Sequence, residues 1–560
     1  MADAATPGTG PMLAADGTPL KRSLARALRR EKLRALALIA PLLIFILVSF
    51  VAPIVDMLFR SVENQIVSRT LPETTATLQT WDFASGDLPP EPVYEALYYD
   101  MFLAAEAKRH TRLGSRLNYE QTGISSLFRS TGRSLDDYGD AWLDVFEDID
   151  PNWDEAAFWV TLMGAGDGAP ALDGLMESQR DRLEALAQES YPGEIAFRPD
   201  ARIAEILPRT ADAYAAFVAY TVLVDGDSPA DEEPWEAVHA ALGTDLSRDG
   251  TAAALASYDG DGAEELRTLL ANADRFPDQS YRDFFLDEDE DWGDLAVWGT
   301  IQAYSPSFTP GYFLAAVDLQ LTVEGISAQP ADQQIYILLF QRTLFMSLMI
   351  MGSCILLGYP IAYLLSNLPM RTSNVLLILV LLPFWTSLLV RTSAWKVLLQ
   401  QQGVINDVLV WAGIVADDSR LVMINNQFGT IVAMTHILLP FMILPLYSVM
   451  KTIPPSYVRA AKSLGATNWT AFWRVYFPQS VPGIGAGSIL VFILAIGYYI
   501  TPELVGGTTG TFISNRIAYH ISSSLNWGLA AALGTILLAV VMLLYWLYDR
   551  IVGIDNVSLG

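Results

Sequence analysis

The sequence predicts an all-α membrane protein with six transmembrane helices and a large, mostly helical extracytoplasmic insertion between the first and the second. Mean hydropathy is positive, at +0.30, although the 560-residue chain has a formal net charge of -27. Both values hold because charge is segregated: residues 61–335 contain 52 of the 62 acidic and 16 of the 35 basic residues, so their net charge is 16 minus 52, or -36. The rest of the chain sums to +9, as in a membrane protein interrupted by an acidic soluble block.

Six apolar stretches are long enough to cross a hydrocarbon core of about 30 Å, which requires about 20 helical residues. They lie near residues 35–59, 336–365, 375–398, 428–450, 481–503 and 527–548. The first is longer than the apolar core of a secretory signal, and no small-residue cleavage site follows it. We therefore interpret residues 35–59 as an uncleaved membrane anchor and residues 336–550 as the region of the other five spans.

The distribution of basic residues predicts the orientation of these spans. Residues 21–34 contain seven Lys and Arg residues against the single acidic residue Glu31, and such clusters remain on the cytoplasmic side. The basic and disordered N-terminus, residues 1–34, and the tail, residues 551–560, are then both cytoplasmic. The same threading places the acidic block, residues 60–335, on the extracytoplasmic side.

The acidic block contains enough large apolar residues to form its own core, among them seven tryptophans. Patches such as SLDDYGDAWLDVFEDID have apolar residues three and four positions apart, the spacing of amphipathic helices. Breaks between helices are predicted at LPPEP, GAGDGAP, DGDSPADEEP and YSPSFTPG. Cys354 is the only cysteine and lies in an apolar span, where we interpret it as a packing residue, so the block is predicted to fold without disulfides.

Two acidic clusters in the block, YDGDGAEE and DEDEDWGD, raise the question of a calcium site. Neither has the ligand spacing of an EF-hand loop, which requires oxygens at positions one, three, five and twelve and a glycine at position six. We interpret both clusters as solvated acidic turns, and a divalent-cation site is the alternative.

The connection between the fourth and fifth apolar stretches predicts a helix-turn-helix outside the bilayer. Pro454 and Pro455 end the fourth span, and Ser456 can cap a short helix over residues 457–464. Gly465 then supplies the left-handed residue that ends this helix.

A second helix in this connection, with the sequence WTAFWRVYF, can be capped by Asn468 and is predicted to stop at Pro478. In the first helix, Ala460 and Ala461 leave part of the backbone nearly bare of side chains. Another surface can therefore approach this backbone closely, which is typical of a docking helix.

This pattern resembles the cytoplasmic docking loop of inner-membrane permease subunits in bacterial ABC importers. The motif of that family reads Glu-Ala-Ala, three residues, Gly, nine residues, Ile, one residue, Leu-Pro. The matching positions in this chain, within a loop over 451–480, are Arg459, Ala460, Ala461, Gly465, Val475, Phe477 and Pro478. Arg459 stands where the family often has glutamate, so a salt bridge of that acid does not carry over, whereas Val475 and Phe477 are conservative changes.

A narrower resemblance is to the spermidine/putrescine-type permeases of this superfamily, close over residues 306–550 and loose in the first span. The segments that carry it are LLGYPIAYLLSNLP, LLPFWTSLLVRTSAWKVLLQQQGVIND, LLPFMILPLYSVM and GSILVFILAIGYYITPELVGG. It implies a type I ABC importer permease fold in the bacterial inner membrane. It also implies import of a polyamine or a similar small organic cation, delivered by an extracytoplasmic binding protein.

The resemblance also implies which partners the chain needs. Permeases of this kind work with two ABC ATPase subunits and a second permease subunit, and no nucleic acid is expected as a partner. No G-x-x-x-x-G-K-[ST] phosphate loop occurs in the sequence. ATP and Mg are therefore expected in the partner ATPase, and this chain is expected to be a transport subunit without a cofactor or catalytic site.

Six residues near the ends or in the middle of spans are candidates for the substrate pathway: Trp385, Trp395, His436, Tyr498, Tyr499 and Glu503. Ionisable groups at membrane depth are costly and tend to face an internal cavity, and aromatic faces can bind an organic cation. The alternatives are an interfacial solvated carboxylate, a packed histidine and an aromatic belt at the membrane surface.

Two other functions remain open from the residues alone. An ion-coupled secondary transporter often has inverted repeats and buried carboxylates, whereas the spans here have no evident repeat and few acids. Alternatively, the spans anchor a sensor or interaction domain formed by the acidic block. If the chain is a permease, the size and side of the block predict an accessory role, in contact with the binding protein.

Overall fold

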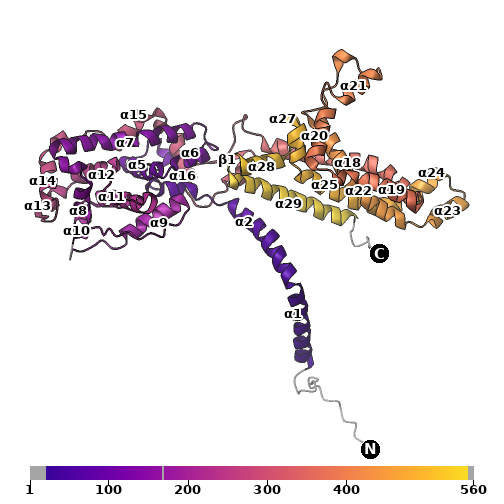
Figure 1. Cartoon of the computed structure of the whole chain (residues 1–560), viewed down its shortest axis with the longest axis horizontal. Coiled ribbons are helices and arrows are strands. Elements are labelled where there is room, and N and C mark those ends of the chain that lie inside the picture. Colours follow the sequence, from indigo (N-terminus) through magenta and orange to yellow (C-terminus); the bar gives the residue numbers. More distant parts are fainter. Residues whose placement is uncertain (1–19, 167–168, 553–560) are drawn as a thin grey trace, which may run out of the picture.

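The computed structural model describes residues 20–166 and 169–552, which form a helical membrane part and a separate helical domain (Figure 1). The two lie end to end along the long axis of the molecule, and the first span, in indigo, points away from both. Residues 1–19 of the predicted disordered N-terminus and residues 553–560 of the predicted tail lie outside the described residues.

The membrane part begins with α1 and continues after the acidic domain with α18. Its elements are α1 (Leu20–Ile46), η1 (Leu47–Val51), α2 (Ala52–Arg60), α18 (Tyr336–Asn367), α19 (Met370–Leu381), η7 (Leu382–Trp385), α20 (Leu388–Leu398), α21 (Val404–Trp411), η8 (Asp417–Ser419), α22 (Gln427–Thr452), α23 (Pro455–Ser463), α24 (Asn468–Ala471), η9 (Phe472–Tyr476), α25 (Phe477–Gly497), α26 (Ile500–Val505), α27 (Gly507–Gly510), α28 (Ile513–Ser522) and α29 (Trp527–Val552). The helix α1 includes residues 20–34, which were predicted to be disordered.

Five helical segments in the described residues are long and apolar enough to cross a membrane, and a bent pair brings the number to six. The five are Glu31–Arg60, Tyr336–Asn367, Gln427–Thr452, Asn468–Gly497 and Trp527–Arg550. The sixth is Met370–Trp385 with Leu388–Leu398, and these two helices meet at 94°. The structure therefore contains the long apolar helices of a multi-pass membrane protein that hydropathy predicts.

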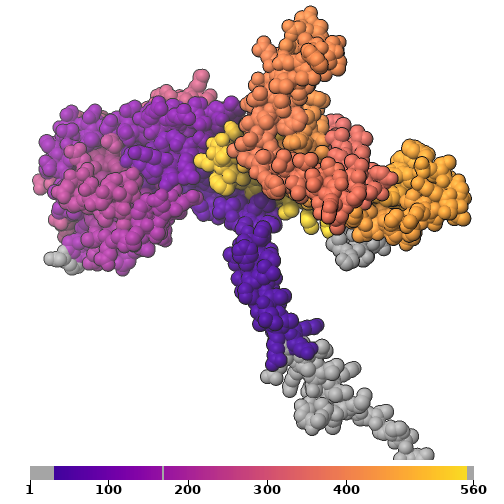
Figure 2. All heavy atoms as spheres, turned by 45° about the vertical axis from the view of Figure 1, so that its right-hand side comes forward, coloured from indigo at the N-terminus to yellow at the C-terminus, as the bar shows by residue number. Residues whose placement is uncertain are grey.

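The predicted third span, 375–398, differs from the prediction because it is not one straight helix. Pro383 lies in the tight turn η7, where its missing N–H and fixed φ interrupt the helical hydrogen bonds. The chain resumes as α20 after the extended residues Thr386 and Ser387. Together α20 and α21 project from the bundle (Figures 1 and 2).

The predicted fifth span, 481–503, is displaced toward the N-terminus in the structure. Its helix runs without interruption from Asn468 to Gly497, and residues 500–503 belong to the separate short helix α26. Pro478 does not stop the helix, contrary to the prediction. It is the second residue of α25, which directly follows the π-helical turn η9, and the wider hydrogen bonds of this turn accommodate a residue without an N–H.

Helices α18, α22 and α25 form the core of the membrane bundle. Met442 on α22 lies between the other two helices, and a Cβ atom at Gly487 of α25 would lie 2.6 Å from its Sδ. Small residues at such contacts let membrane helices approach closely. Cys354 on α18 is fully buried in this core, which agrees with the packing role predicted for it.

The acidic domain is helical, as predicted, and also contains a two-stranded antiparallel hairpin that the sequence analysis did not predict. Its elements are α3 (Ile66–Thr70), α4 (Pro72–Leu78), η2 (Phe83–Ser85), α5 (Glu91–Glu106), α6 (His110–Leu117), α7 (Ile124–Ile149), η3 (Pro151–Asp154), α8 (Ala156–Met163), α9 (Leu175–Ala187), α10 (Ala201–Ile206), α11 (Pro208–Tyr220), η4 (Thr221–Asp225), α12 (Glu236–Ser247), α13 (Thr251–Ser257), α14 (Ala263–Ala271), η5 (Ala273–Arg275), α15 (Tyr281–Glu288), η6 (Glu290–Gly293), α16 (Leu295–Ala303), α17 (Gly311–Ala315), β1 (Leu319–Thr322) and β2 (Gly325–Ala328). Three of the predicted breaks, LPPEP, DGDSPADEEP and YSPSFTPG, lie at junctions between elements and overlap a helix end by one or two residues, and the described residues of GAGDGAP lie between α8 and α9.

The acidic domain is a tandem repeat, which the sequence analysis missed. The segments DIDPNWDEAAFWVTL (148–162) and DEDEDWGDLAVWGTI (287–301) share a pattern of Asp, Trp, Ala, Trp and Thr at equal spacing. In both, an Asp caps a short turn and the second Trp indole donates to the carbonyl of the first: Trp159 to Trp153 at 2.8 Å and Trp298 to Trp292 at 2.9 Å. Two of the acids of DEDEDWGD, Asp289 and Asp294, therefore act as helix caps.

The two halves of the repeat exchange contacts reciprocally. The Tyr94 hydroxyl on α5 donates to the carbonyl of Trp292 at 3.3 Å, and at the equivalent place in the other half His239 Nε2 on α12 donates to the carbonyl of Trp153 at 3.1 Å. Helix α12 likewise packs on α7 of the first half, and α5 packs on α15 of the second. Each half thus completes the core of the other, and the repeat forms one domain.

The equivalence of Tyr94 and His239 gives a pH-dependence prediction. Burial lowers the pKa of His239 to about 4, whereas a histidine in the unfolded chain titrates near 6.5. The unfolded chain therefore binds more protons between these values, and stability falls by about 3 kcal/mol as pH drops through this window. We expect His239→Tyr to remove this contribution while keeping the hydrogen bond to Trp153.

Urea unfolding of the wild type and of His239→Tyr, near pH 7 and near pH 5, measures the contribution of His239 to the free energy of unfolding. The wild type should lose more stability than the variant on acidification. Equal losses in the two chains would show that the buried imidazole does not contribute.

Candidate functional site

The loop between α22 and α25 forms an exposed knob at the end of the bundle farthest from the acidic domain (Figure 1). Helix α23 begins after Pro454 and has no buried residue. Ser456, predicted as its cap, lies inside the helix, because Pro455 has no N–H to satisfy and its φ already suits the first helical position. The helix therefore starts earlier than predicted.

Gly465 ends α23 as predicted, with φ of +91°. The N–H of Gly465 donates to the carbonyl of Lys462 at 3.0 Å, and the N–H of Ala466 donates to that of Ala461 at 3.1 Å. These two hydrogen bonds form a Schellman motif, which satisfies the last carbonyls of the helix. The turn is therefore well defined although it is exposed.

The second helix of the loop starts one residue away from the predicted cap. Thr467, with extended backbone, accepts the hydrogen bond from the N–H of Thr470 at 3.2 Å, so Thr467 and not Asn468 is the cap. A hydroxyl directly before the first helical residue reaches this N–H.

The motif residues of the loop are distributed over an exposed and an inner face. Arg459, Ala460, Gly465 and Pro478 are exposed, whereas Ala461, Val475 and Phe477 are half-buried. Large apolar side chains stand beside them in solvent, including Leu464, which is 90% exposed, and Trp469, which is 72% exposed. Such a patch on a short helical knob marks an interaction site.

Aromatic contacts connect the knob to the long helix α18. The rings of Phe472 and Tyr476 lie 5.7 and 5.1 Å from that of Tyr363. The hydroxyl of Tyr476 also lies 3.2 Å from Oγ of Ser366. These close-packed rings join the π turn η9 to α18 of the membrane bundle.

Two of the predicted pathway residues, Trp395 and His436, meet although they are far apart in the sequence. The indole Nε1 of Trp395 on α20 donates to Nδ1 of His436 on α22 at 3.1 Å, and the ring centroids are 5.5 Å apart. The neutral imidazole therefore carries its proton on Nε2. The pair presents one half-buried aromatic surface.

A second group forms around Asn515 of α28, a residue that the sequence analysis missed. Its Nδ2 donates to Oε2 of Glu503 at 2.6 Å and to the carbonyl of Tyr499 at 2.9 Å. The two groups are linked, since Oγ1 of Thr392 on α20 lies 3.2 Å from Oγ1 of Thr501 on α26. No motif pointed to Asn515, because an isolated amide in a polar segment carries no sequence signal.

The other two predicted residues lie apart from these groups. The ring of Tyr498 is half-buried against the bundle core, and its carbonyl accepts from Oγ of Ser514 at 3.0 Å. Trp385 is 73% exposed and makes no side-chain hydrogen bond within the described residues. Its place near the bend of the third span suits the membrane-surface alternative.

Comparison with known proteins matches residues 344–552 to the family described as binding-protein-dependent transport system inner membrane component. The spermidine/putrescine transport system permease protein PotB of Salmonella typhimurium is 34% identical over 222 residues, which are 39% of this chain and 77% of that protein. The inner membrane ABC transporter permease protein YdcU of Escherichia coli is 29% identical over 276 residues, 47% of this chain and 86% of that protein.

Among solved structures, a chain of a bacterial alginate ABC transporter in complex with alginate pentasaccharide-bound periplasmic protein is 19% identical, with a TM-score of 0.34. The match covers 40% of this chain and 80% of that chain. The family match itself lies wholly within the membrane part. It includes the knob, the Trp395–His436 pair and the group around Asn515. The chain therefore belongs to the family of binding-protein-dependent transport system inner membrane components and is a permease subunit of an ABC importer.

Proposed function

We propose that this permease imports a polyamine such as spermidine or putrescine, or a similar small organic cation. The observation that carries the proposal is the 34% identity with a spermidine/putrescine permease over 77% of that protein. The paired rings of Trp395 and His436 and the Glu503 carboxylate support it. Aromatic faces and a carboxylate are the groups that attract an alkylammonium ion.

The knob formed by residues 455–478 is proposed to dock the ATPase. Its exposed helix α23, bare at Ala460, and its apolar tip at Leu464 suit insertion into a groove of a partner chain. In this proposal two ATPase subunits bind and hydrolyse ATP with Mg, and a second permease subunit completes the transport pathway. The cytoplasmic placement of both termini belongs to the same proposal.

The acidic domain is proposed to lie outside the cytoplasm and to contact the substrate-binding protein. Its net charge of -36 over residues 61–335 would raise the local concentration of a cationic substrate, although salt screens this field beyond about 8 Å. A pull-down of the binding protein with chains that contain or lack residues 70–305 tests this role. Equal retention by both chains would remove it.

Uptake of labelled spermidine into cells tests the proposed transport. Uptake should require this chain and an intact partner ATPase, and unlabelled putrescine should compete with it. Uptake that survives inactivation of the ATPase but stops when the ion gradients are collapsed would contradict the proposal.

The Trp395–His436 pair gives a more specific prediction. Trp395→Phe removes the indole donor but keeps a ring, and spermidine uptake should fall about three- to tenfold. The matched control is Trp411→Phe. Trp411 is 87% exposed on α21 and lies outside the Trp395–His436 pair and the group around Asn515. The amount of bound ATPase should not change in either chain. Equal uptake by the two variants would contradict a role for the pair.

A further inference from the structure

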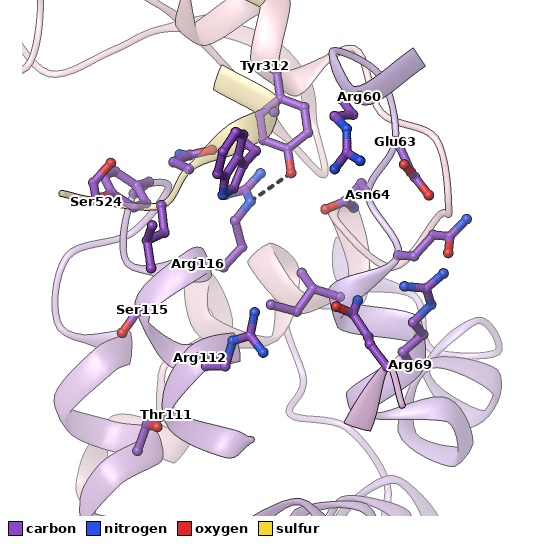
Figure 3. Close-up of a pocket in the computed structure, with 18 residues that line it drawn as sticks. Arg60, Glu63, Asn64, Arg69, Thr111, Arg112, Ser115, Arg116, Tyr312 and Ser524 are labelled. Carbon is purple, nitrogen blue, oxygen red and sulfur yellow. Dashed lines mark hydrogen bonds between the residues drawn. The ribbon is translucent and has the colours of Figure 1, made fainter. Parts of the chain in front are cut away.

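A cavity of about 590 Å³ lies where α2 and α29 meet the acidic domain (Figure 3). Four arginines line it, Arg60, Arg69, Arg112 and Arg116, and Glu63 is the only acidic residue in its wall. The local charge is therefore positive in a domain whose net charge is strongly negative. Such a cavity repels a polyamine and selects an anion.

Two of these arginines have no ion-pair partner among the described residues. Arg60 pairs with Asp56 at 2.7 Å and Arg116 with Glu120 at 2.7 Å. In the part of the chain that the structure describes, Arg69 on α3 and Arg112 on α6 form no ion pair. Figure 3 shows both side chains at the lower side of the cavity, across from Tyr312.

Arg116 is the buried member of the group, with only 7% of its surface exposed. Its Nε donates to the hydroxyl of Tyr312 at 3.1 Å, and its guanidinium lies over the ring of Tyr312, 4.6 Å from the centroid. Its Nη2 has no hydrogen-bond acceptor. This atom is buried behind the cavity surface, so Arg116 contributes a positively charged wall and not an accessible donor.

The cavity lies at the ends of two membrane helices. Arg60 is the last residue of α2 and Trp527 is the first residue of α29, and both line the cavity. These are the helix ends on the side of the acidic domain, opposite the α23 knob (Figure 1). Arginine and tryptophan at such positions lie at the level of the lipid headgroups.

We propose that this cavity binds a phosphate group, supplied by the headgroup of a membrane phospholipid. Arginine guanidinium groups bind phosphate oxygens in a bidentate manner, and Arg69 and Arg112 provide such donors in one cavity whose wall also contains Arg116. Its position lets a lipid phosphate enter without leaving the headgroup layer. The bound lipid would fasten the acidic domain to the membrane bundle at the cavity.

Native mass spectrometry of the full chain in mild detergent, with phosphatidylglycerol added, tests the proposal. The wild type should retain the lipid. The amount of lipid retained by the double variant Arg69→Gln/Arg112→Gln should be at least about tenfold lower. The matched control is Arg129→Gln/Arg133→Gln, which removes two exposed charges of the same domain outside the cavity. It should retain lipid as the wild type does. Ser115→Glu is a second variant, because it adds a carboxylate to the cavity wall and should also expel the lipid.

Inorganic phosphate distinguishes the two sources of the anion. If it raises the unfolding temperature of the wild type but not of the double variant, while no lipid is retained, the site is a phosphate site filled from solution. Equal lipid retention by wild type and both cavity variants, without any effect of phosphate, would overturn the proposal.

Discussion

Gly465→Val is expected to reduce the amount of ATPase that co-purifies with this chain at least about tenfold. Gly465 has φ of +91°, a conformation that costs a β-branched residue about 1–3 kcal/mol. Valine would favour another backbone conformation and break the hydrogen bonds from Gly465 to Lys462 and from Ala466 to Ala461. The end of α23 and the direction of Leu464 would then change, so the knob would no longer fit its partner.

Gly86→Val is the matched control for this variant. Gly86 has φ of +75°, and a Cβ atom at either glycine would meet nothing within 4 Å. The two substitutions therefore impose similar backbone strain without a clash, but Gly86 lies in the acidic domain, far from the knob. The control should retain its ATPase and its uptake. Equal amounts of ATPase with both variants would show that the shape of the turn is not needed for docking.

Asp100→Ala is expected to lower the free energy of unfolding of the acidic domain by about 3–5 kcal/mol. Asp100 on α5 is 1% exposed, and its Oδ1 pairs with Nη2 of Arg182 at 2.8 Å. Its Oδ2 accepts from both N and Oγ1 of Thr74, each at 2.7 Å. Alanine would leave Nη2 of the mostly buried Arg182 and the buried N–H of Thr74 without acceptors, although Nη1 of Arg182 keeps its pair with Glu73 at 3.1 Å. Buried donors without acceptors cost more than the loss of the pair itself.

Asp148→Ala provides the comparison, because Asp148 pairs with Arg275 at 3.0 Å on the surface, where the side chains are 74% and 42% exposed. Such a pair contributes about 0–1 kcal/mol. Hydrogen exchange of the α5 amides in the full chain measures the free energy of opening for both variants. A difference below about 1 kcal/mol between them would contradict the importance of burial for this network.

The division into membrane and soluble parts was predictable from sequence, because hydropathy and charge separate them at residues 60 and 336. The turn at Gly465 was also predictable, since a glycine after a short polar helix reports the left-handed conformation directly. The caps of α23 and α24 were each predicted one or two residues late. Ser456 and Asn468 are both residue types that cap helices well, but the N-cap residues in the structure are Pro454 and Thr467.

The bend of the third span could not be predicted from the sequence, because a straight span and a bent span have the same apolar composition. Pro383 was visible, yet prolines in the fourth and fifth spans, such as Pro440, are accommodated within long helices. The tandem repeat was missed for another reason. Its first half has one long helix, α7, where its second half has α14 and α15 separated by a turn.

The polar groups of the bundle depended on tertiary contacts. Trp395 and His436 were both candidates, but only the packing of α20 against α22 joins them. Asn515 holds Glu503 and the Tyr499 carbonyl from a helix that no motif marked. Residue types therefore identified Trp395, His436, Tyr499 and Glu503, whereas Asn515 and the contacts between these residues followed only from the fold.

A photo-activated cross-linker at Leu464 tests the central claim, that the α23 knob docks a separate ATPase, most directly. Leu464 is 90% exposed at the tip of the knob, and Trp411, 87% exposed on α21, is a control position of similar exposure away from it. In native membranes, Leu464 is expected to cross-link to a chain with a G-x-x-x-x-G-K-[ST] phosphate loop, and Trp411 is not. If Leu464 captures no such chain, or if Trp411 captures it equally, the docking role of the knob is contradicted.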